Sequence, residues 1–181
     1  QELIQKDLIL SGHDRSDGGL ITTLLEMAFG GNCGLEVEIE SRHQSTAHGG
    51  SVVSSTSELF LLFSEELGLV IEYLQENEKD VLRVLKENSV PYQIIGRSLS
   101  EKRIKISLRP PNSELRTVLD EDMRILRDIW EETSYHLERI QTNSDCADKE
   151  RRVNFDRKGP RYKLTFTPQN PSIPPLAKEG K

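Results

Sequence analysis

Cysteine is scarce in this sequence. The only two cysteines, Cys33 and Cys146, lie far apart among 181 residues. Two thiols cannot form a disulfide framework, and they cannot supply a four-cysteine zinc site. Because structural disulfides belong mainly to oxidising compartments, this composition favours a cytoplasmic protein.

The sequence also lacks long apolar runs and an excess of basic residues. No stretch approaches the roughly 18 apolar residues of a membrane-spanning helix, and we expect no signal peptide. The formal net charge is −6. Residues 143–181 hold nine Lys/Arg and five Asp/Glu, a net +4, which leaves −10 for residues 1–142. We therefore expect neither a membrane nor a nucleic acid as partner, since phosphate contacts need a basic face.

Apolar residues divide the chain at the same place. Leu, Ile, Val and Phe number 50, of which 44 lie in residues 1–142 and six in residues 143–181. The first part can bury a core, and the second cannot do so alone. We expect one domain over residues 1–142 and an irregular, proline-rich linker over residues 143–181. Because the chain begins at Gln1, abruptly and in a strand-like run, we also expect it to be a piece of a longer protein.

Hydrophobic periodicity predicts a mixed α/β fold, with roughly five or six strands and three helices. Leu35, Val37 and Ile39 alternate with glutamates, which is typical of a half-buried strand. A left-handed cap at Gly30-Gly31-Asn32 is expected to end the first helix. The expected strands are residues 6–10, 35–40, 58–63, 69–73, 92–95 and 103–108; the expected helices are residues 20–29, 77–88 and 114–141, with a surface loop at 42–57.

The turn at residues 12–19 has the residue types of an anion site. It joins an expected buried strand to an amphipathic helix, whose first N–H groups have no partner within the helix. Its glycines allow a ligand to approach the backbone, and Ser16 can donate a hydroxyl. Asp14 adds a hard oxygen ligand of the kind that Mg²⁺ takes together with phosphate oxygens and water. A metal–nucleotide complex could therefore bind both to the unpartnered N–H groups and to the carboxylate of Asp14.

A purely structural interpretation explains the same residues, and spacing alone favours it. Asp or Ser before a helix is most often its N-cap, and Gly-Gly is often only a turn. Asp17 is the expected cap, which leaves Asp14 without an evident structural role. We expect His13 to be a hydrogen-bonded turn residue, because no Cys or Ser–Asp constellation stands near it.

Other candidate chemistry is weaker. An EF-hand loop starting at Asp14 would place Leu25 where the bidentate glutamate belongs. No phosphate-binding P-loop, nucleophile elbow or histidine pair at metal spacing occurs. We expect Glu65 and Glu66, like the Glu131-Glu132 pair, to be solvated charges, and Trp130 to belong to the core.

Four segments resemble one family. HDRSDGGL (13–20) and LLEMAFGGNCG (24–34) are similar to the phosphoribosylformylglycinamidine synthase family, also called FGAR amidotransferases. ELFLLFSEELGLVIE (58–72) resembles the segment that follows in the second aminoimidazole-ribonucleotide (AIR) synthetase-like repeat of its large single-chain form. DIWEETSYHLERIQTNSDCADKE (128–150) resembles the end of that repeat.

The resemblance implies an AIR-synthetase C-terminal-domain-like α/β (α+β) fold and a role in purine biosynthesis. These enzymes convert formylglycinamide ribonucleotide, ATP and glutamine to formylglycinamidine ribonucleotide. The second repeat holds an auxiliary Mg²⁺–nucleotide (ATP/ADP) site, so Asp14 would be a magnesium ligand and Ser16 a nucleotide contact. The remaining partners would be the first repeat, the N-terminal half of the second repeat and a glutaminase domain, all in the same polypeptide.

Two alternatives remain open at the level of sequence. The chain could be a structural or interaction module whose turn binds no ligand. It could also belong to a related AIR synthetase or selenophosphate-type kinase, although residues 130–150 resemble the large amidotransferase alone. If the chain is a part of the amidotransferase, we expect it by itself to have neither synthetase nor glutaminase activity.

Overall fold

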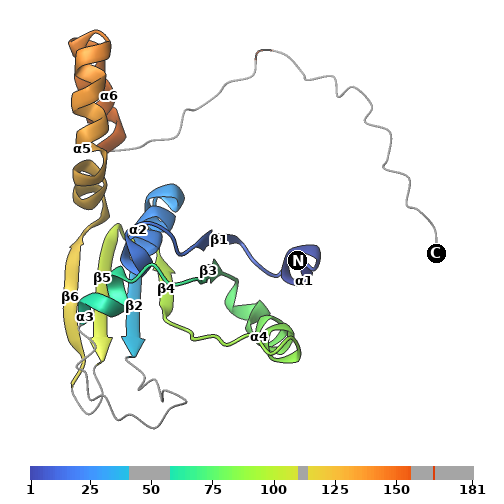
Figure 1. The fold of residues 1–181 in the computed structure, drawn as a ribbon. Helices are drawn as coiled ribbons and strands as arrows, with labels where there is room; N and C mark the ends of the chain where they lie inside the picture. Colours follow the sequence, from blue (N-terminus) through green and yellow to red (C-terminus); the bar gives the residue numbers. More distant parts are fainter. Residues whose placement is uncertain (41–57, 110–113, 156–164, 166–181) are drawn as a thin grey trace.

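The computed structural model describes residues 1–40, 58–109, 114–155 and 165. Two sheets and their helices make up this part of the chain (Figure 1). The helices are α1 (Glu2–Gln5), α2 (Gly19–Gly31), α3 (Glu58–Phe63), α4 (Glu78–Glu87), α5 (Met123–Gln141) and α6 (Ser144–Phe155); the strands are β1 (Ser11–Asp14), β2 (Gly34–Glu40), β3 (Leu69–Glu72), β4 (Gly96–Leu99), β5 (Arg103–Arg109) and β6 (Arg116–Asp122). The expected mixed sheet with packed helices is confirmed.

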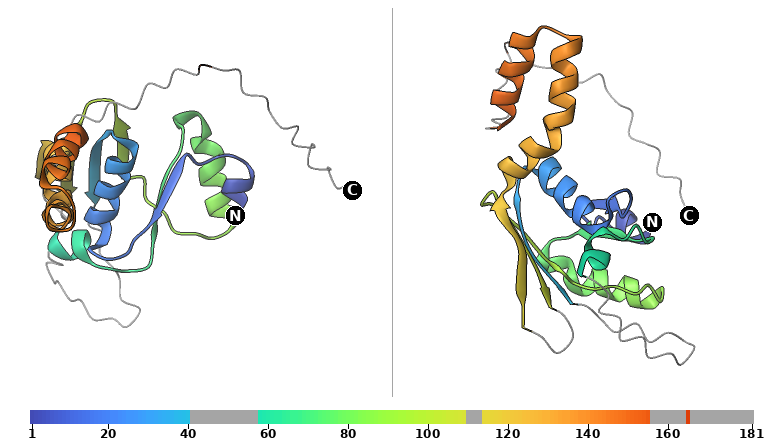
Figure 2. Two further views of the ribbon diagram at one scale, coloured as in Figure 1. Left: turned by 90° about the horizontal axis from the view of Figure 1, so that it is seen from above. Right: turned by 60° about the vertical axis from the view of Figure 1, so that its left-hand side comes forward.

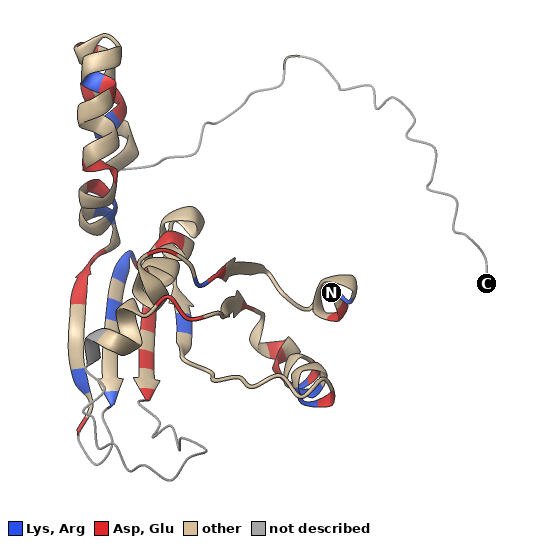
Figure 3. Ribbon diagram, viewed as in Figure 1, with Lys and Arg blue, Asp and Glu red and all other residues tan. Residues whose placement is uncertain are grey.

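The larger sheet has the strand order β4-β2-β5-β6. Strand β2 runs parallel to β5 and antiparallel to β4, and β5 runs antiparallel to β6. Val37 lies opposite Ile106, and both are buried. The glutamates that alternate with these apolar residues pair with arginines, Glu36 with Arg97 at 2.7 Å. One face of the sheet is therefore apolar and the other carries paired charges. Figure 3 shows the acidic positions along β2 and the basic positions along β5.

Helix α2 covers the apolar face of this sheet (Figure 2). Its buried residues Leu24, Ala28 and Phe29 join the sheet residues and Leu62 of α3 in one core. The helix ends at Asn32, whose φ of 47° is left-handed and whose N–H donates to the carbonyl of Phe29. The predicted helix and its left-handed cap are thus confirmed, with Asn32 rather than a glycine in the left-handed position.

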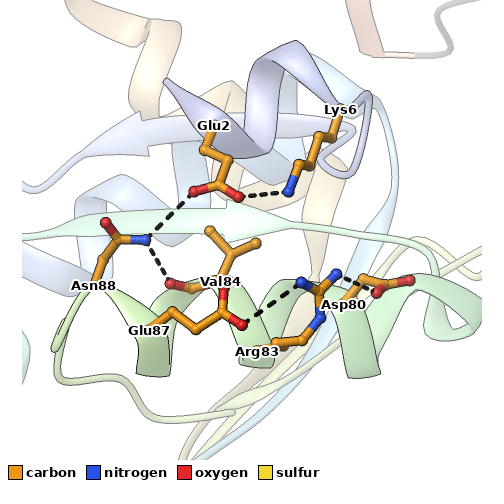
Figure 4. Close-up of polar contacts among 7 residues, drawn as sticks. All are labelled: Glu2, Lys6, Asp80, Arg83, Val84, Glu87 and Asn88. Atoms are coloured by element: carbon orange, nitrogen blue, oxygen red, sulfur yellow. Dashed lines mark hydrogen bonds and ion pairs between the residues drawn. The ribbon is translucent and has the colours of Figure 1, made fainter.

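Strands β1 and β3 form a separate antiparallel ribbon, with His13 opposite Val70. Beyond the ribbon, α1 lies beside α4 (Figure 4). The side-chain amide of Asn88 links them, since it donates to Glu2 at 3.4 Å and to the Val84 carbonyl at 2.9 Å. A short 3₁₀ turn at Gln75–Asn77 precedes α4.

Helices α5 and α6 form a hairpin that extends beyond one end of the larger sheet (Figures 1 and 2). Arg151 of α6 makes two hydrogen bonds of 2.7 Å to the carboxylate of Asp128 on α5. Tyr135 donates its hydroxyl proton to Asp148 at 2.7 Å. The expectation of irregular structure from Asn143 onward is therefore wrong for Ser144–Phe155, a helix that packs on α5 through these polar contacts and buries Ala147.

Two predicted strands are shifted along the chain. Residues 6–10 precede β1, because the short helix α1 forms at the start of the chain and Asp7, with a left-handed φ of 52°, follows its end. Residues 92–95 precede β4, which begins at Gly96. A Cβ at Gly96 would lie 2.1 Å from the carbonyl oxygen of Glu36, so glycine lets the two backbones approach where pairing starts.

Two other predictions assigned the wrong element. Residues 58–63 are helix α3 and not a strand, because a short continuous apolar run has no periodicity that separates the two. In the expected helix 114–141, residues 116–122 instead form β6, and α5 starts only at Met123. The side chain of Asp122 accepts from the N–H of Arg124, which makes Asp122 the N-cap. The expected loop 42–57 and the proline-rich end of the chain lie outside the described residues.

Candidate functional site

The turn predicted to carry chemistry lies between β1 and α2. Strand β1 ends at Asp14, and the N–H of Arg15 donates to the carbonyl of Gly68 at 2.8 Å, which extends the ribbon by one residue. Gly18 and Gly19 follow with φ values of 82° and 73°. These left-handed conformations suit glycine, and they turn the chain from the ribbon into the helix within a few residues.

Packing against α3 makes the second glycine indispensable. A Cβ at Gly19 would lie 2.6 Å from the carbonyl carbon of Phe63, the last residue of α3. The end of α3 therefore packs directly against the N-terminus of α2. This contact brings Glu65 and Glu66, which follow α3, next to the turn.

Both predicted ligand residues are exposed. The side chain of Asp14 is 72% exposed, and its Oδ1 lies 3.5 Å from Nδ1 of His13. Ser16 is also exposed, while its carbonyl accepts the N–H of Gly19 at 3.0 Å. The backbone of Asp14 is held from inside, because buried Thr23 donates its hydroxyl proton to the Asp14 carbonyl at 3.3 Å. The turn thus has an anchored backbone with exposed polar side chains.

The prediction that Asp17 caps α2 is wrong. The N-cap is Gly18, and no side chain of the turn caps the helix. The N–H of Gly18 donates instead to Oε1 of Glu65 at 3.0 Å. A carboxylate from 47 residues away satisfies this amide because the α3 contact delivers it there, a relation that local spacing cannot show.

Glu65 and Glu66 have separate partners. Glu66 lies 3.9 Å from Nη1 of Arg15, whereas Glu65 accepts from Gly18. The expectation that both are solvated charges is therefore wrong for Glu65, which is a component of the turn. Sequence reasoning missed its role.

His13 is the hydrogen-bonded turn histidine that was expected. Its Nδ1 lies 2.7 Å from the carbonyl oxygen of Asp14, and its Nε2 lies 3.2 Å from Glu26 of α2. Trp130 differs from the prediction, because it is 51% exposed, although its ring lies 6.4 Å from that of the core residue Phe29, measured between centroids. Burial raises the pKa of the Cys33 thiol, and the nearby Glu72 adds to this effect.

The described residues do not build a complete metal centre. They contain no group of three or more His, Cys, Asp or Glu side chains placed to hold an ion. Asp14 nevertheless fits one position of a shared Mg²⁺ site, since protein-bound Mg²⁺ usually takes one or two carboxylates and completes its shell with phosphate oxygens and water. Across the same described ranges, no helix is both long and apolar enough to cross a membrane.

The fold and the glycine turn define the class of protein. The family described as "AIR synthase related protein, C-terminal domain" matches residues 1–109, and the chain belongs to it. Among solved structures, the Thermotoga maritima protein titled "PurL complexed with ATP" has a TM-score of 0.53 at 16% identity, covering 69% of this chain and 20% of that one. The ADP complex of the same protein has a TM-score of 0.51 at 15% identity, over 69% of this chain and 20% of that one. This likeness confirms the fold.

The curated relatives are phosphoribosylformylglycinamidine synthases. The protein from Dictyostelium discoideum is 38% identical over 191 residues, covering 99% of this chain and 13% of that protein. The human protein is 37% identical over 180 residues, covering 96% of this chain and 12% of that protein. The Arabidopsis thaliana protein, named as probable and chloroplastic/mitochondrial, is 37% identical over 170 residues, covering 94% of this chain and 11% of that protein. The chain therefore spans about an eighth of the length of these relatives.

Proposed function

We propose that this chain forms part of a phosphoribosylformylglycinamidine synthase, a C–N ligase that uses glutamine as amide donor in purine biosynthesis. The supporting observation is 37–38% identity to three such enzymes over at least 94% of the chain. In the proposed reaction, ATP phosphorylates the amide oxygen of formylglycinamide ribonucleotide, and ammonia released from glutamine displaces that phosphate. The products are formylglycinamidine ribonucleotide, ADP, phosphate and glutamate. The proposed compartment is the cytoplasm.

Within that enzyme, the proposed role is the C-terminal half of the second AIR-synthetase-like repeat. Residues 1–142 would form this domain, and residues 143–181 would lead toward a glutaminase domain. The first repeat and the N-terminal half of the second repeat would be the other partners in the polypeptide. The T. maritima neighbours titled as complexes with ATP and ADP support nucleotide binding by proteins of this fold.

The proposed site residues are Asp14 and Ser16. Asp14 would give one carboxylate oxygen to Mg²⁺, and Ser16 would donate a hydrogen bond to the nucleotide. Their exposure leaves both side chains accessible to a ligand that other parts of the enzyme help to hold. A bound Mg²⁺ would supply charge neutralisation for the phosphates, and the chain itself would orient the nucleotide in an auxiliary site without acting in the reaction.

The test compares Asp14→Ala and Ser16→Ala with Asp17→Ala in the complete enzyme. Asp17 lies in the same turn and makes no side-chain cap, so it is the matched control. The purified protein is denatured and the released ADP is measured by chromatography. We expect both ligand variants to release less nucleotide than the wild type and Asp17→Ala to release the same amount. Unchanged retention in Asp14→Ala and Ser16→Ala would contradict the proposed site.

One observation favours a second candidate, a structural module whose turn binds no ligand. Glu65 already occupies the N–H of Gly18, where a phosphate oxygen would otherwise be expected. The same experiment separates the two, because a structural module predicts that all three variants behave like the wild type.

A further inference from the structure

We propose that Arg15 is a positioning residue that fixes Asp14 and Ser16 on the exposed side of the turn. The inference rests on the proposed function, in which these two side chains are the ligands. Arg15 itself would touch neither Mg²⁺ nor the nucleotide. It would act by holding the backbone between them.

The side chain of Arg15 points into the protein. It is only 17% exposed, whereas Asp14 before it is 72% exposed. Nη2 donates to the carbonyl oxygen of Leu61 in α3 at 3.2 Å. The stem lies against Gly68, where an added Cβ would meet Cβ and Cδ of Arg15 at 3.8 Å. One side chain therefore joins the turn both to α3 and to the segment that leads into β3.

Because the backbone is extended here, the inward direction of the Arg15 side chain determines the direction of the side chains before and after it. Successive side chains of an extended chain point to opposite sides, so residues i−1 and i+1 share a side. The Arg15 N–H still pairs with Gly68, which keeps the chain extended at this residue. With Arg15 inward, Asp14 and Ser16 are both directed outward, as their exposure shows.

The anchor is poorly explained as a stabilising contact alone. Nε of Arg15 is buried and has no hydrogen-bond partner among the described residues. Among the residues that the structure describes, the carboxylate facing its guanidinium is that of Glu66, which is half exposed and 3.9 Å away. An apolar side chain of similar length would fill the same space without this desolvation cost. What the guanidinium adds is the directed bond to Leu61, which fixes the turn relative to α3.

The first arm of the test measures the anchor in the 181-residue chain. Arg15→Met keeps the stem and removes the guanidinium. We expect hydrogen exchange at the amides of Arg15 and Gly19 to become about tenfold faster, as for the loss of one directed hydrogen bond. Arg83→Met, an exposed arginine on α4, is the matched control and should leave these amides unchanged. Unchanged exchange in Arg15→Met would overturn the inference.

The second arm measures Mg–ADP affinity in the complete enzyme by calorimetric titration. We expect Arg15→Met to weaken binding about tenfold, the equivalent of about 1.4 kcal/mol, and Arg15→Lys to recover part of the loss. Val84→Ala, which removes buried volume in α4, serves as a destabilised control and should keep its affinity well below its melting temperature. A merely structural role for Arg15 would make Arg15→Met behave like Val84→Ala.

The outcomes separate the two proposals. If Asp14→Ala weakens binding and Arg15→Met does not, the positioning role is wrong and the proposed site stands. If neither variant changes the affinity, the proposed site fails, and the positioning role fails with it. Weakened binding in both, with faster exchange in Arg15→Met, supports both.

Discussion

The guanidinium of Arg127 joins three parts of the chain. It is 2% exposed and donates to the side-chain oxygen of Asn32, at the end of α2, at 3.2 Å. It also donates to the carbonyls of Asn154 and Phe155 at the C-terminus of α6. Helix C-terminal carbonyls lack partners within their own helix, so this arginine satisfies groups that would otherwise need water. Arg127 thereby attaches the α5–α6 hairpin to the domain.

We expect Arg127→Met to destabilise the protein by about 1–3 kcal/mol, because three acceptors lose a charged donor while the desolvation cost of the arginine is removed. Urea unfolding followed by circular dichroism would measure this difference. Arg97→Met is the matched control, since Arg97 is exposed and pairs with Glu36 on the outer face of the sheet. Equal stability of the two variants would show that Arg127 is not an anchor.

The hairpin, taken as an element, depends on an ion pair as much as on apolar packing. Hydrogen bonds from Arg151 hold the pKa of Asp128 below its ordinary value, and the Arg151 guanidinium also lies over the Tyr135 ring at 4.3 Å. A lowered carboxyl pKa means that the pair stabilises the folded state at pH values above the ordinary carboxyl pKa. That contribution is lost as the pH falls through the lowered value.

We therefore expect α6 to lose protection from hydrogen exchange on going from pH 6 to pH 3, after correction for the intrinsic rates. The side chain of Asp128 is 34% exposed, so solvent screening limits the effect to about 1 kcal/mol or less. Asp128→Asn should show reduced protection already at pH 6 and little further change in acid. Glu150→Gln, an exposed carboxylate variant on the same helix, should behave like the wild type, and an identical acid response in both variants would contradict this assignment.

Elements with a full amphipathic period were predictable from the sequence. Helix α2, helix α4 and strands β2 and β5 stand where their patterns place them. Helix α3 and strand β6 were not, because the first is short and uniformly apolar and the second has apolar residues that also suit helical spacing. Asp122 was the one local signal missed, since an N-cap aspartate marks the true start of α5.

Only those residues of the candidate site that are close together in the sequence were predictable. Asp14, Ser16 and the glycines belong to one short segment, whereas Glu65 reaches the turn through the packing of α3 on Gly19. Trp130 illustrates the same limit. Periodicity indicates that a helix has an apolar side, but it does not show which element packs against that side. Here α6 contacts the polar side of α5.

At the scale of the whole molecule, the donors available for chemistry are few. At the turn the described residues offer two exposed carboxylates, Asp14 and Asp17, and the hydroxyl of Ser16, but no cluster of metal-ligating side chains. Of the two free thiols, Cys33 is half-buried, and burial raises its pKa, the opposite of what a nucleophile needs. Cys146 is exposed on α6, an element that does not belong to the turn.

We accordingly expect the 181-residue chain, purified alone, to show neither synthetase nor glutaminase activity. A glutaminase needs an activated thiolate, and a synthetase needs its phosphate charge neutralised by more ligands than this turn supplies. Glutamate release from glutamine and ADP formation from ATP would be measured at matched protein concentration, with the Cys33→Ser/Cys146→Ser variant as control for contaminating enzyme. Glutamate release that the double variant abolishes would show that a thiol of this chain is catalytic and would contradict its assignment to a non-catalytic part of the enzyme.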